Sequence, residues 1–436
     1  MNSPQPPARK LSLGVIFLTL YIDLVGFSII FPLLPDLLHH YLSTEGHSGL
    51  LGYLYSASVS AAHLVGNKEG YAEVLFGGVV ASLFSVLQFL LSPFWGGLSD
   101  RRGRRPVLLW TVAGTAFGYL VWVFSGSFWL FVVSRAIGGI FGGNISVATA
   151  AVADVTSRQE RTKAMGLVGA AFGLGLVTGP MIGALAMRFN PLAHCTAFGL
   201  NVFSFPALLS LILSLINVIW IARRFAEPLD QAHRQRMSSE RIRNPLKAIY
   251  FLSDPIVRRI NLISFIHSLA FVSLEVTLTY LAADRFHYNA KQNGMLLAFL
   301  GVCSILTQGV LVRRLLKPSN ENTVLATGLA IEMLGLLGIA FAFSSWLLYL
   351  GIALAAVGAG FVNPSTSGLI SLHSSPAEQG KAIGVFRSLG ALARAITPIV
   401  AGLVYWSFSA LSLYVAGAVV ALVAFTLAVQ LPKPVR

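Results

Sequence analysis

Six charged side chains lie within long apolar stretches of this sequence, where a charge that faces lipid without a partner is costly. They are Asp23, Arg135, Glu275, Glu332, Arg387 and Arg394. A carboxylate beside a cation in an apolar cavity can alternate between an ion pair and a protonated, neutral form as the cavity opens. These residue types therefore permit reversible proton binding that is coupled to a change of access.

Among these six residues, Asp23 and Arg135 are the two nearest the N-terminus. We expect them to form an ion pair between two helices. An ion pair that only fixes helix packing is the alternative. His267 lies about two helical turns before Glu275, so the two share roughly one face of a helix. Either could carry a proton, because histidine titrates near neutrality. A hydrogen-bonded packing role is the alternative for His267.

Arg387 and Arg394 are also about two turns apart on one face of a helix. Arginines so placed can bind a carboxylate or a phosphate, in bidentate fashion where the geometry allows. We expect one of them to pair with Glu275 and the other to stay available, which favours an anionic substrate. Polar and aromatic residues of other apolar stretches complete the predicted substrate site: Gln88, Asn144, Asn363, Phe27, Phe31 and Phe271.

The elements that hold these residues are predicted to be membrane-spanning helices. Of the 436 residues, 55% are hydrophobic and 11% charged, and such a chain cannot bury its apolar surface in water. A spanning helix needs about 20 largely apolar residues. Twelve such runs are present, near 11–38, 74–98, 106–124, 127–153, 164–187, 198–221, 260–283, 293–312, 322–343, 346–372, 380–404 and 409–431. The more polar run 48–67 is predicted to be a loop segment or a surface helix within the long loop 39–73.

The formal net charge of +14 comes from Lys and Arg residues that gather in alternate loops. By the positive-inside rule, this pattern predicts that both termini are cytoplasmic. The basic excess is thus a topology signal and does not indicate a nucleic-acid partner. The two cysteines rule out a disulfide framework and a Cys-rich metal site. The loops carry no nucleotide-binding fingerprint, so we expect no cofactor, no metal and no enzyme activity.

The chain is predicted to consist of two similar halves. The polar stretch 222–259 separates a six-helix half, residues 1–221, from a second one, residues 260–436. Residues 157–183 align without gaps with residues 375–401, which indicates a duplication. Duplicated six-helix halves with a site between them near mid-membrane are a transporter architecture. A membrane scaffold that transports nothing is the alternative.

The loop between the second and third runs reads Gly97-Leu98-Ser99-Asp100-Arg101-Arg102-Gly103-Arg104-Arg105-Pro106. It resembles the signature loop of the major facilitator superfamily through Gly97, Asp100, Arg101, Gly103, Arg104 and Arg105. In that family the loop latches the two halves together in the outward-facing state. The corresponding segment of the second half has Arg313 in place of the acid, so a second latch looks degenerate.

Residues Gly175, Gly179, Pro180 and Gly183 of the fifth run resemble the antiporter motif of the same superfamily. Small residues permit close helix contact, and proline bends the helix. Ordinary small-residue packing is the alternative. The segments around Asp23 and Arg135 are similar to drug:proton antiporters of the tetracycline-exporter type. Residues 74–78, 84–90 and 387–395 resemble a eukaryotic branch of tetracycline-transporter-like proteins implicated in organic-anion efflux.

This resemblance implies an all-α membrane protein of twelve transmembrane helices in two pseudo-symmetric halves. It also implies a structural role for Glu332, because the ninth helix is peripheral in the family. We therefore expect a proton-coupled exporter of small amphipathic solutes, a drug or an organic anion, that acts as a monomer in a lipid bilayer. A uniporter or a symporter on the same fold is the alternative.

Overall fold

The computed structural model describes residues 11–46, 49, 51–53, 56, 72–156, 158–195, 197–229, 254–315, 320–374 and 379–432, and for some of these, including Arg387, only the backbone. Within these residues, nine helical stretches are long and apolar enough to cross a membrane, and three further helices carry shorter apolar stretches, 83–92, 291–306 and 392–407. Together they are the twelve helices that the sequence predicts. The fold class is thereby confirmed.

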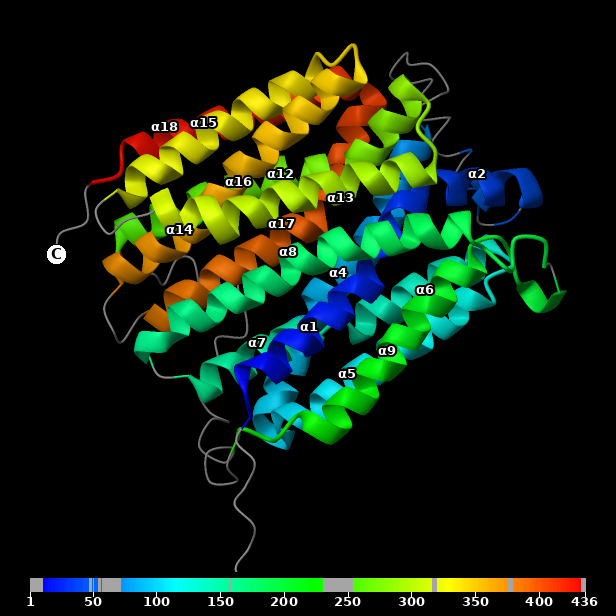
Figure 1. Ribbon diagram of the computed structural model, residues 1–436, viewed down its shortest axis with the longest axis horizontal. Helices are drawn as coiled ribbons and strands as arrows, with labels where there is room; N and C mark the ends of the chain where they lie inside the picture. The colour runs from blue at the N-terminus through cyan, green and yellow to red at the C-terminus, as the bar shows by residue number, and fades with distance from the viewer. Residues whose placement is uncertain are drawn as a thin grey trace, which may run out of the picture.

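The helices form two bundles that lie side by side (Figure 1). The first bundle contains α1 (Leu13–Ser28), α4 (Ala72–Arg102), α5 (Arg104–Val123), α6 (Phe128–Phe141), α7 (Asn144–Val155), α8 (Arg158–Arg188) and α9 (Ser204–Arg224). The second contains α12 (Pro255–Phe286), α13 (Ala290–Leu306), α14 (Val312–Leu315), α15 (Glu321–Ala340), α16 (Ser345–His373), α17 (Gln379–Ser407) and α18 (Ala410–Val429). A π-helical segment, η4 (Thr307–Leu311), joins α13 to α14.

The first spanning helix ends earlier than its apolar run predicts. After α1 the chain forms the short helix η1 (Phe31–Leu33) and then the separate helix α2 (Leu34–Glu45). Each of these two begins with a proline in its first turn, where the missing N–H is not needed. The prediction for 48–67 falls mostly on residues outside the described set. So does most of the linker 222–259, and the predicted domain boundaries stay a prediction.

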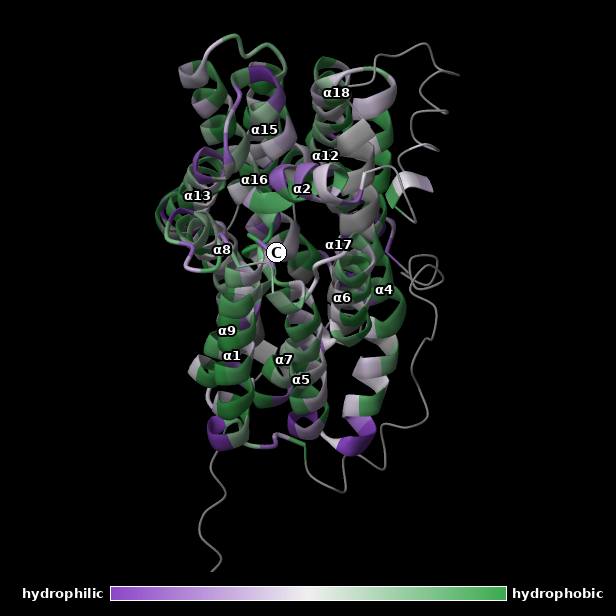
Figure 2. Ribbon diagram, turned by 90° about the vertical axis from the view of Figure 1, so that its right-hand side faces the viewer, coloured by the Kyte–Doolittle hydropathy of each residue, from purple (hydrophilic) through white to green (hydrophobic). Residues whose placement is uncertain are grey.

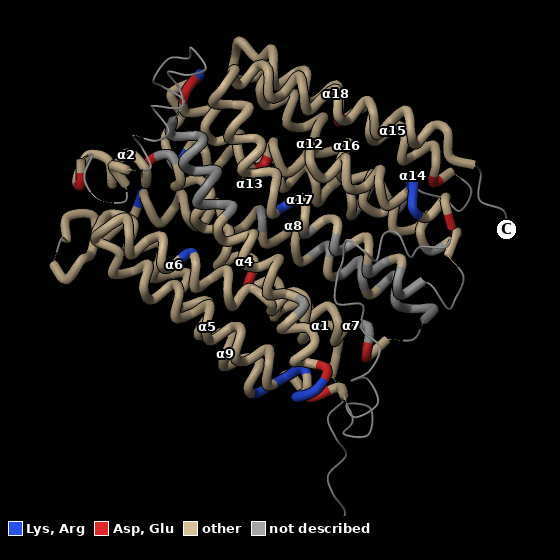
Figure 3. The backbone as a smooth tube through the Cα atoms, turned by 180° about the vertical axis from the view of Figure 1, so that it is seen from behind, with Lys and Arg blue, Asp and Glu red and all other residues tan. Residues whose placement is uncertain are grey.

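Polar residues mark the two ends of the bundles. Hydrophobic residues line the helices along their lengths, and hydrophilic residues gather at helix ends and on α2 (Figure 2). Most charged residues likewise lie at helix ends (Figure 3). We call the end at which α4 gives way to α5 the latch end, and the opposite end, at which α2 lies, the α2 end.

The two bundles contact each other through α4 with α17 and through α8 with α13. Gly294 of α13 lies against the carbonyl of Pro180, and Gly301 lies against Val177. At the α2 end, Phe31 and Leu34 pack against the apolar cores of both halves. At the latch end, a Cβ added to Gly97 or Gly368 would meet none of the described atoms within 4 Å. The halves are thus joined at the α2 end by apolar contacts around Phe31 and Leu34.

Candidate transport site

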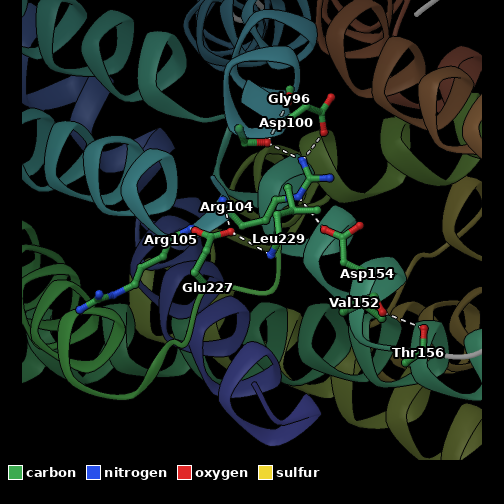
Figure 4. A network of polar contacts seen from close by, with 10 residues as sticks. Gly96, Asp100, Arg104, Arg105, Val152, Asp154, Thr156, Glu227 and Leu229 are labelled. Carbon is green, nitrogen blue, oxygen red and sulfur yellow. Dashed lines mark hydrogen bonds and ion pairs between the residues drawn. The ribbon is translucent and has the colours of Figure 1, made fainter. Parts of the chain in front are cut away.

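Figure 4 shows the buried Arg104 between Asp100 and Asp154, at the turn between α4 and α5. Gly103, in the turn itself, has φ +101°, a conformation that residues with a Cβ rarely adopt. The Arg104 side chain is only 2% exposed and forms ion pairs with Asp100 at 2.5 Å and with Asp154 of α7 at 2.7 Å. Its Nη1 also donates to Ser99 Oγ at 2.6 Å. These contacts tie α4, α5 and α7 together at the latch end.

A second carboxylate caps this turn. Glu227, just beyond α9, accepts hydrogen bonds from the backbone N–H groups of Arg104 and Arg105, each at 2.9 Å. These N–H groups belong to the first turn of α5, where a helix has unsatisfied donors and a positive dipole end. The Arg105 guanidinium in turn donates to the carbonyl of Ala222. The start of the linker is therefore anchored on the signature loop, whereas the Arg101 side chain is exposed.

Sequence reasoning missed Asp154 and Glu227. Each is an acid just outside the apolar core of its run, and only the excess of arginines in the signature loop signals that acids must come from elsewhere. Nothing in the local pattern says which acids those are.

In the first half, Asp23 and Arg135 face different partners. The Asp23 carboxyl on α1 is hydrogen-bonded to the side chain of Asn144. Asn144 opens α7, directly after Gly142 and Gly143 interrupt the span that α6 begins. The break thus turns a polar amide toward α1. The structure brings Asp23 together with a predicted substrate residue and does not form the expected ion pair with Arg135.

Arg135 instead lies among aromatic rings. Its guanidinium carbon is 4.8 Å from the ring centre of Trp122, 5.6 Å from that of Phe131 and 5.8 Å from that of Tyr119. The side chain is 5% exposed, and its Nε donates to Ser134 Oγ at 3.3 Å. The described part of the chain places no carboxylate in an ion pair with it. The cation is held by cation–π contacts, which gain strength when desolvated.

In the second half, His267 contacts Glu332, the acid for which the family resemblance implies a structural role. His267 Nδ1 of α12 lies 2.7 Å from Glu332 Oε2 of α15, and both side chains are buried. The Phe271 ring stacks on the imidazole at 6.0 Å between ring centres. Glu275 lies within electrostatic range of His267 and of Arg394 on α17. The ionisable residues therefore form a series from α15 through α12 to α17: Glu332, His267, Glu275 and Arg394.

Two predicted substrate residues present polar groups in mid-helix. Arg394 lies near the middle of α17 and Asn363 within α16, and both side chains are exposed although the surrounding helices are apolar. The Arg387 side chain lies outside the described set. Gln88 donates to the carbonyl of Gly142 at 2.8 Å and so binds to the break between α6 and α7. Phe27 packs on Phe31 and Phe84, with ring centres at 5.1 and 4.8 Å.

The glycines of α8 form its contact with α1. A Cβ on Gly179 would collide with Ser28 Oγ, and one on Gly183 with the carbonyl of Ile29. Ser28 Oγ donates to the carbonyl of Gly175 at 2.9 Å. The glycines of the predicted antiporter motif thus pack α8 tightly against α1 within the first half. The Pro180 carbonyl faces α13 of the second half, so α8 also contacts the second bundle.

Two bundles of spanning helices that carry charged side chains within the spans are typical of a secondary transporter. Residues 16–323 and 262–436 match the family model of the Major Facilitator Superfamily, and the chain belongs to this superfamily. It is therefore a transporter and not an enzyme.

The chain is similar to proteins of the same superfamily from humans and bacteria. It is 36% identical over 440 residues to human major facilitator superfamily domain-containing protein 10, covering 99% of this chain and 95% of the relative. It is 28% identical to the class B tetracycline resistance protein of Escherichia coli, covering 88% and 86% of the two chains. The crystal structure of the human organic anion transporter MFSD10 (TETRAN) superposes with a TM-score of 0.78 at 34% identity, covering 97% of this chain and 100% of that one.

Proposed function

We propose that this protein exports small organic anions across a membrane in exchange for protons. The observation that carries the proposal is Arg394, an exposed arginine in the middle of a spanning helix with Glu275 within electrostatic range. An arginine in an apolar span binds carboxylates strongly, because its planar fork matches their geometry. The similarity to a human organic anion transporter supports the same substrate class.

Protons are the proposed coupling ion. Asp23 contacts a neutral amide and Glu275 lies between His267 and Arg394, so each acid can exist with or without its proton. The anion binds at Arg394 while Asp23 is unprotonated, and it is released on the other side of the membrane. Asp23 then takes up a proton on that side, and the empty, protonated carrier brings this proton back, so that anion and proton cross in opposite directions. The similarity to tetracycline resistance proteins supports export as the direction.

The proposed cycle exposes this site alternately to the two sides of the membrane. With the termini cytoplasmic, the latch end faces the cytoplasm and the closed α2 end faces outward. The conformation described here is then the inward-facing one, in which substrate enters from the cytoplasm. Closing the latch end and parting Phe31 and Leu34 from the second half would release it outside.

A matched pair of solutes in proteoliposomes tests this proposal. p-Aminohippurate and procainamide share a p-aminobenzamide core, but the first is an anion and the second a cation. We expect a pH gradient to drive uptake of p-aminohippurate and not of procainamide. Preference for procainamide would contradict the assignment of an anionic substrate, and flux that ignores the pH gradient would indicate a uniporter.

Substitution of Arg394 ties the preference to the site. Arg394→Gln removes a charge-assisted contact, so we expect uptake of p-aminohippurate to fall about tenfold or more. Arg394→Lys keeps the charge but loses the planar guanidinium group, so its uptake of p-aminohippurate should lie between that of the wild type and that of Arg394→Gln. Equal transport by all three proteins would remove Arg394 from the substrate site.

A further inference from the structure

We propose that Tyr119, Trp122 and Phe131 are positioning residues that hold Arg135 away from Asp23 while the Asp23 carboxyl is protonated. When Asp23 loses its proton, Arg135 leaves these rings and pairs with the carboxylate. We call the three residues the arginine cage. This inference rests on the proposed proton coupling and deepens it, because it names the groups that set the position of the cation.

The cage follows from the packing of α5 against α6. A Cβ on Gly118 would lie 3.1 Å from the carbonyl of Ser134 and 3.2 Å from the N of Gly138, so α5 approaches α6 closely there. The close approach places Tyr119 and Trp122, one helical turn apart on α5, against Arg135. A long side chain on a helix points back over the preceding turn, which brings Arg135 onto Phe131 of its own helix.

The rings act on Arg135 through their faces and not through hydrogen bonds. Trp122 is fully buried, and its Nε1 has no hydrogen-bond partner among the described atoms. A buried indole N–H without a partner is uncommon. The geometry points to the indole face, 4.8 Å from the guanidinium carbon, as the reason for an aromatic side chain here.

Tyr119 connects the cage to the helix that carries Asp23. Its hydroxyl lies 3.7 Å from the place where a Cβ on Gly26 would stand, and Gly26 is about one helical turn from Asp23 on α1. Tyr119 is also within electrostatic range of both Asp23 and Arg135. Tyr119 thus connects the cage to the part of α1 that carries Asp23.

The protonation state of Asp23 decides which partner Arg135 prefers. A neutral carboxyl attracts a guanidinium weakly, so the rings hold it; an ionised carboxylate in an apolar span attracts it far more strongly. The other titratable groups near Arg135 lie on α2. Tyr41 is within electrostatic range of Arg135, and Glu45 is bound at the first turn of α6, where Phe128 N donates to it. On α4, the uncharged Gln88 binds the break between α6 and α7, and on α7, Asn144 begins the helix.

Paired substitutions separate this role from simple packing. Phe131 and Phe128 are both buried on α6, and the Phe131 ring centre lies 5.6 Å from the guanidinium carbon of Arg135. Phe131→Leu is therefore the cage variant and Phe128→Leu its matched control. Trp122→Leu removes a second ring, whereas Trp122→Phe retains an aromatic face. Folding of each variant is checked by exchange of labelled for unlabelled p-aminohippurate without a pH gradient.

The measurement is the pH midpoint of gradient-driven p-aminohippurate transport. Loss of a ring weakens the caged state and favours the Arg135–Asp23 ion pair, so Asp23 binds its proton less readily. We expect Trp122→Leu and Phe131→Leu to shift the midpoint toward acid by about one pH unit, the size of one desolvated cation–π contact. Trp122→Phe should shift it by less than half as much, and Phe128→Leu should leave it in place.

Two results would overturn the inference. One is a midpoint that stays the same in the cage variants while their rate falls equally at every pH, since that is the signature of packing alone. The other is an equal shift in Phe131→Leu and Phe128→Leu. A wild-type protein without any pH dependence would instead refute the proposed proton coupling, and the cage with it. If Trp122→Leu fails to fold, the two phenylalanine variants still decide the question.

Discussion

The two halves of this transporter surround their buried acids differently. In the first half, Asp23 faces the neutral side chain of Asn144 while Arg135 lies apart among aromatic rings. In the second half, Glu332 contacts His267 directly, and Glu275 lies within electrostatic range of Arg394. One duplicated scaffold thus holds a separated acid and cation on one side and a connected series of charges on the other. We infer that proton binding at Asp23 in the first half drives the change of conformation, and that the second half binds the organic anion.

The ends of the halves differ as well. In the first half, Arg104 joins α4, α5 and α7 through two carboxylates, and Glu227 caps α5. The corresponding connection of the second half is the π-helical η4 followed by the short helix α14, which includes Arg313. A π-helical segment is a locally strained form that often marks functional sites. The duplication therefore kept the spanning helices and allowed their connections to diverge.

The largest loss of stability is expected from substitution of Arg104 at the latch end of the first half. Arg104→Gln removes the cation that forms ion pairs with the Asp100 and Asp154 carboxylates, and loss of one partner of a buried pair typically costs about 3–5 kcal/mol. We expect a lower unfolding temperature in detergent and loss of transport. Arg101→Gln, on an exposed side chain, is the matched control and should unfold like the wild type. Equal behaviour of the two variants would contradict the central role of Arg104.

The next effect tests the contact between α8 and α1. Gly179→Ala places a methyl group on Ser28 Oγ and the Val25 carbonyl, and such overpacking costs about 1–3 kcal/mol. Transport should fall with stability, because α8 also contacts the other half. Gly173→Ala serves as control, since its methyl would lie at an ordinary 3.6 Å from Ile305. If both variants transport alike, the glycines of α8 are not needed for close packing.

A smaller effect is expected from the His267–Glu332 pair. Glu332→Leu leaves a buried imidazole N–H or nitrogen without a partner, at a cost of about 1–3 kcal/mol, whereas Glu332→Gln can retain one hydrogen bond. Leu should therefore destabilise the protein more than Gln, as measured by thermal unfolding in detergent. The opposite order would show that a hydrogen bond from residue 332 to His267 does not stabilise the contact between α12 and α15.

The smallest effect is expected at the α2 end. Burial lowers the pKa of His40 below its usual value, and Glu45 opposes this shift only in part. The folded protein therefore binds a proton less readily than the unfolded chain, whose histidine titrates near pH 6.5. Stability from this group is complete above that pH and is lost as the pH falls. His40→Gln should flatten the acid side of the unfolding-temperature profile; an unchanged profile would exclude His40 as its source.

The helices of this fold are predictable from sequence because each spanning run is apolar along its whole length. The same property hides how the helices face one another, since residues toward lipid and toward a neighbouring helix are equally apolar. The signature loop and the glycines of α8 could be found because special residues at fixed spacing mark them. The predicted roles of the other site residues stay predictions.

The partners of the buried charges could not be predicted in this way. Arg135 meets Tyr119 and Trp122 only because Gly118 lets α5 approach α6. Glu332 lies in a helix that the resemblance marks as peripheral, yet it reaches His267 across the bundle. Glu227 caps a helix more than a hundred residues earlier in the chain. Each contact depends on tertiary packing between distant segments, and local sequence patterns carry no signal for it.

We propose that organic anions and protons cross the membrane in opposite directions, with the anion at Arg394 and the proton on Asp23. The most direct test records the internal pH of proteoliposomes, with a trapped dye, while p-aminohippurate flows out down its own gradient. We expect the wild-type protein to acidify the lumen as the anion leaves, and we expect Asp23→Asn not to do so, although it still exchanges labelled for unlabelled p-aminohippurate. Outflow of p-aminohippurate without any change of internal pH in the wild-type protein would contradict proton exchange.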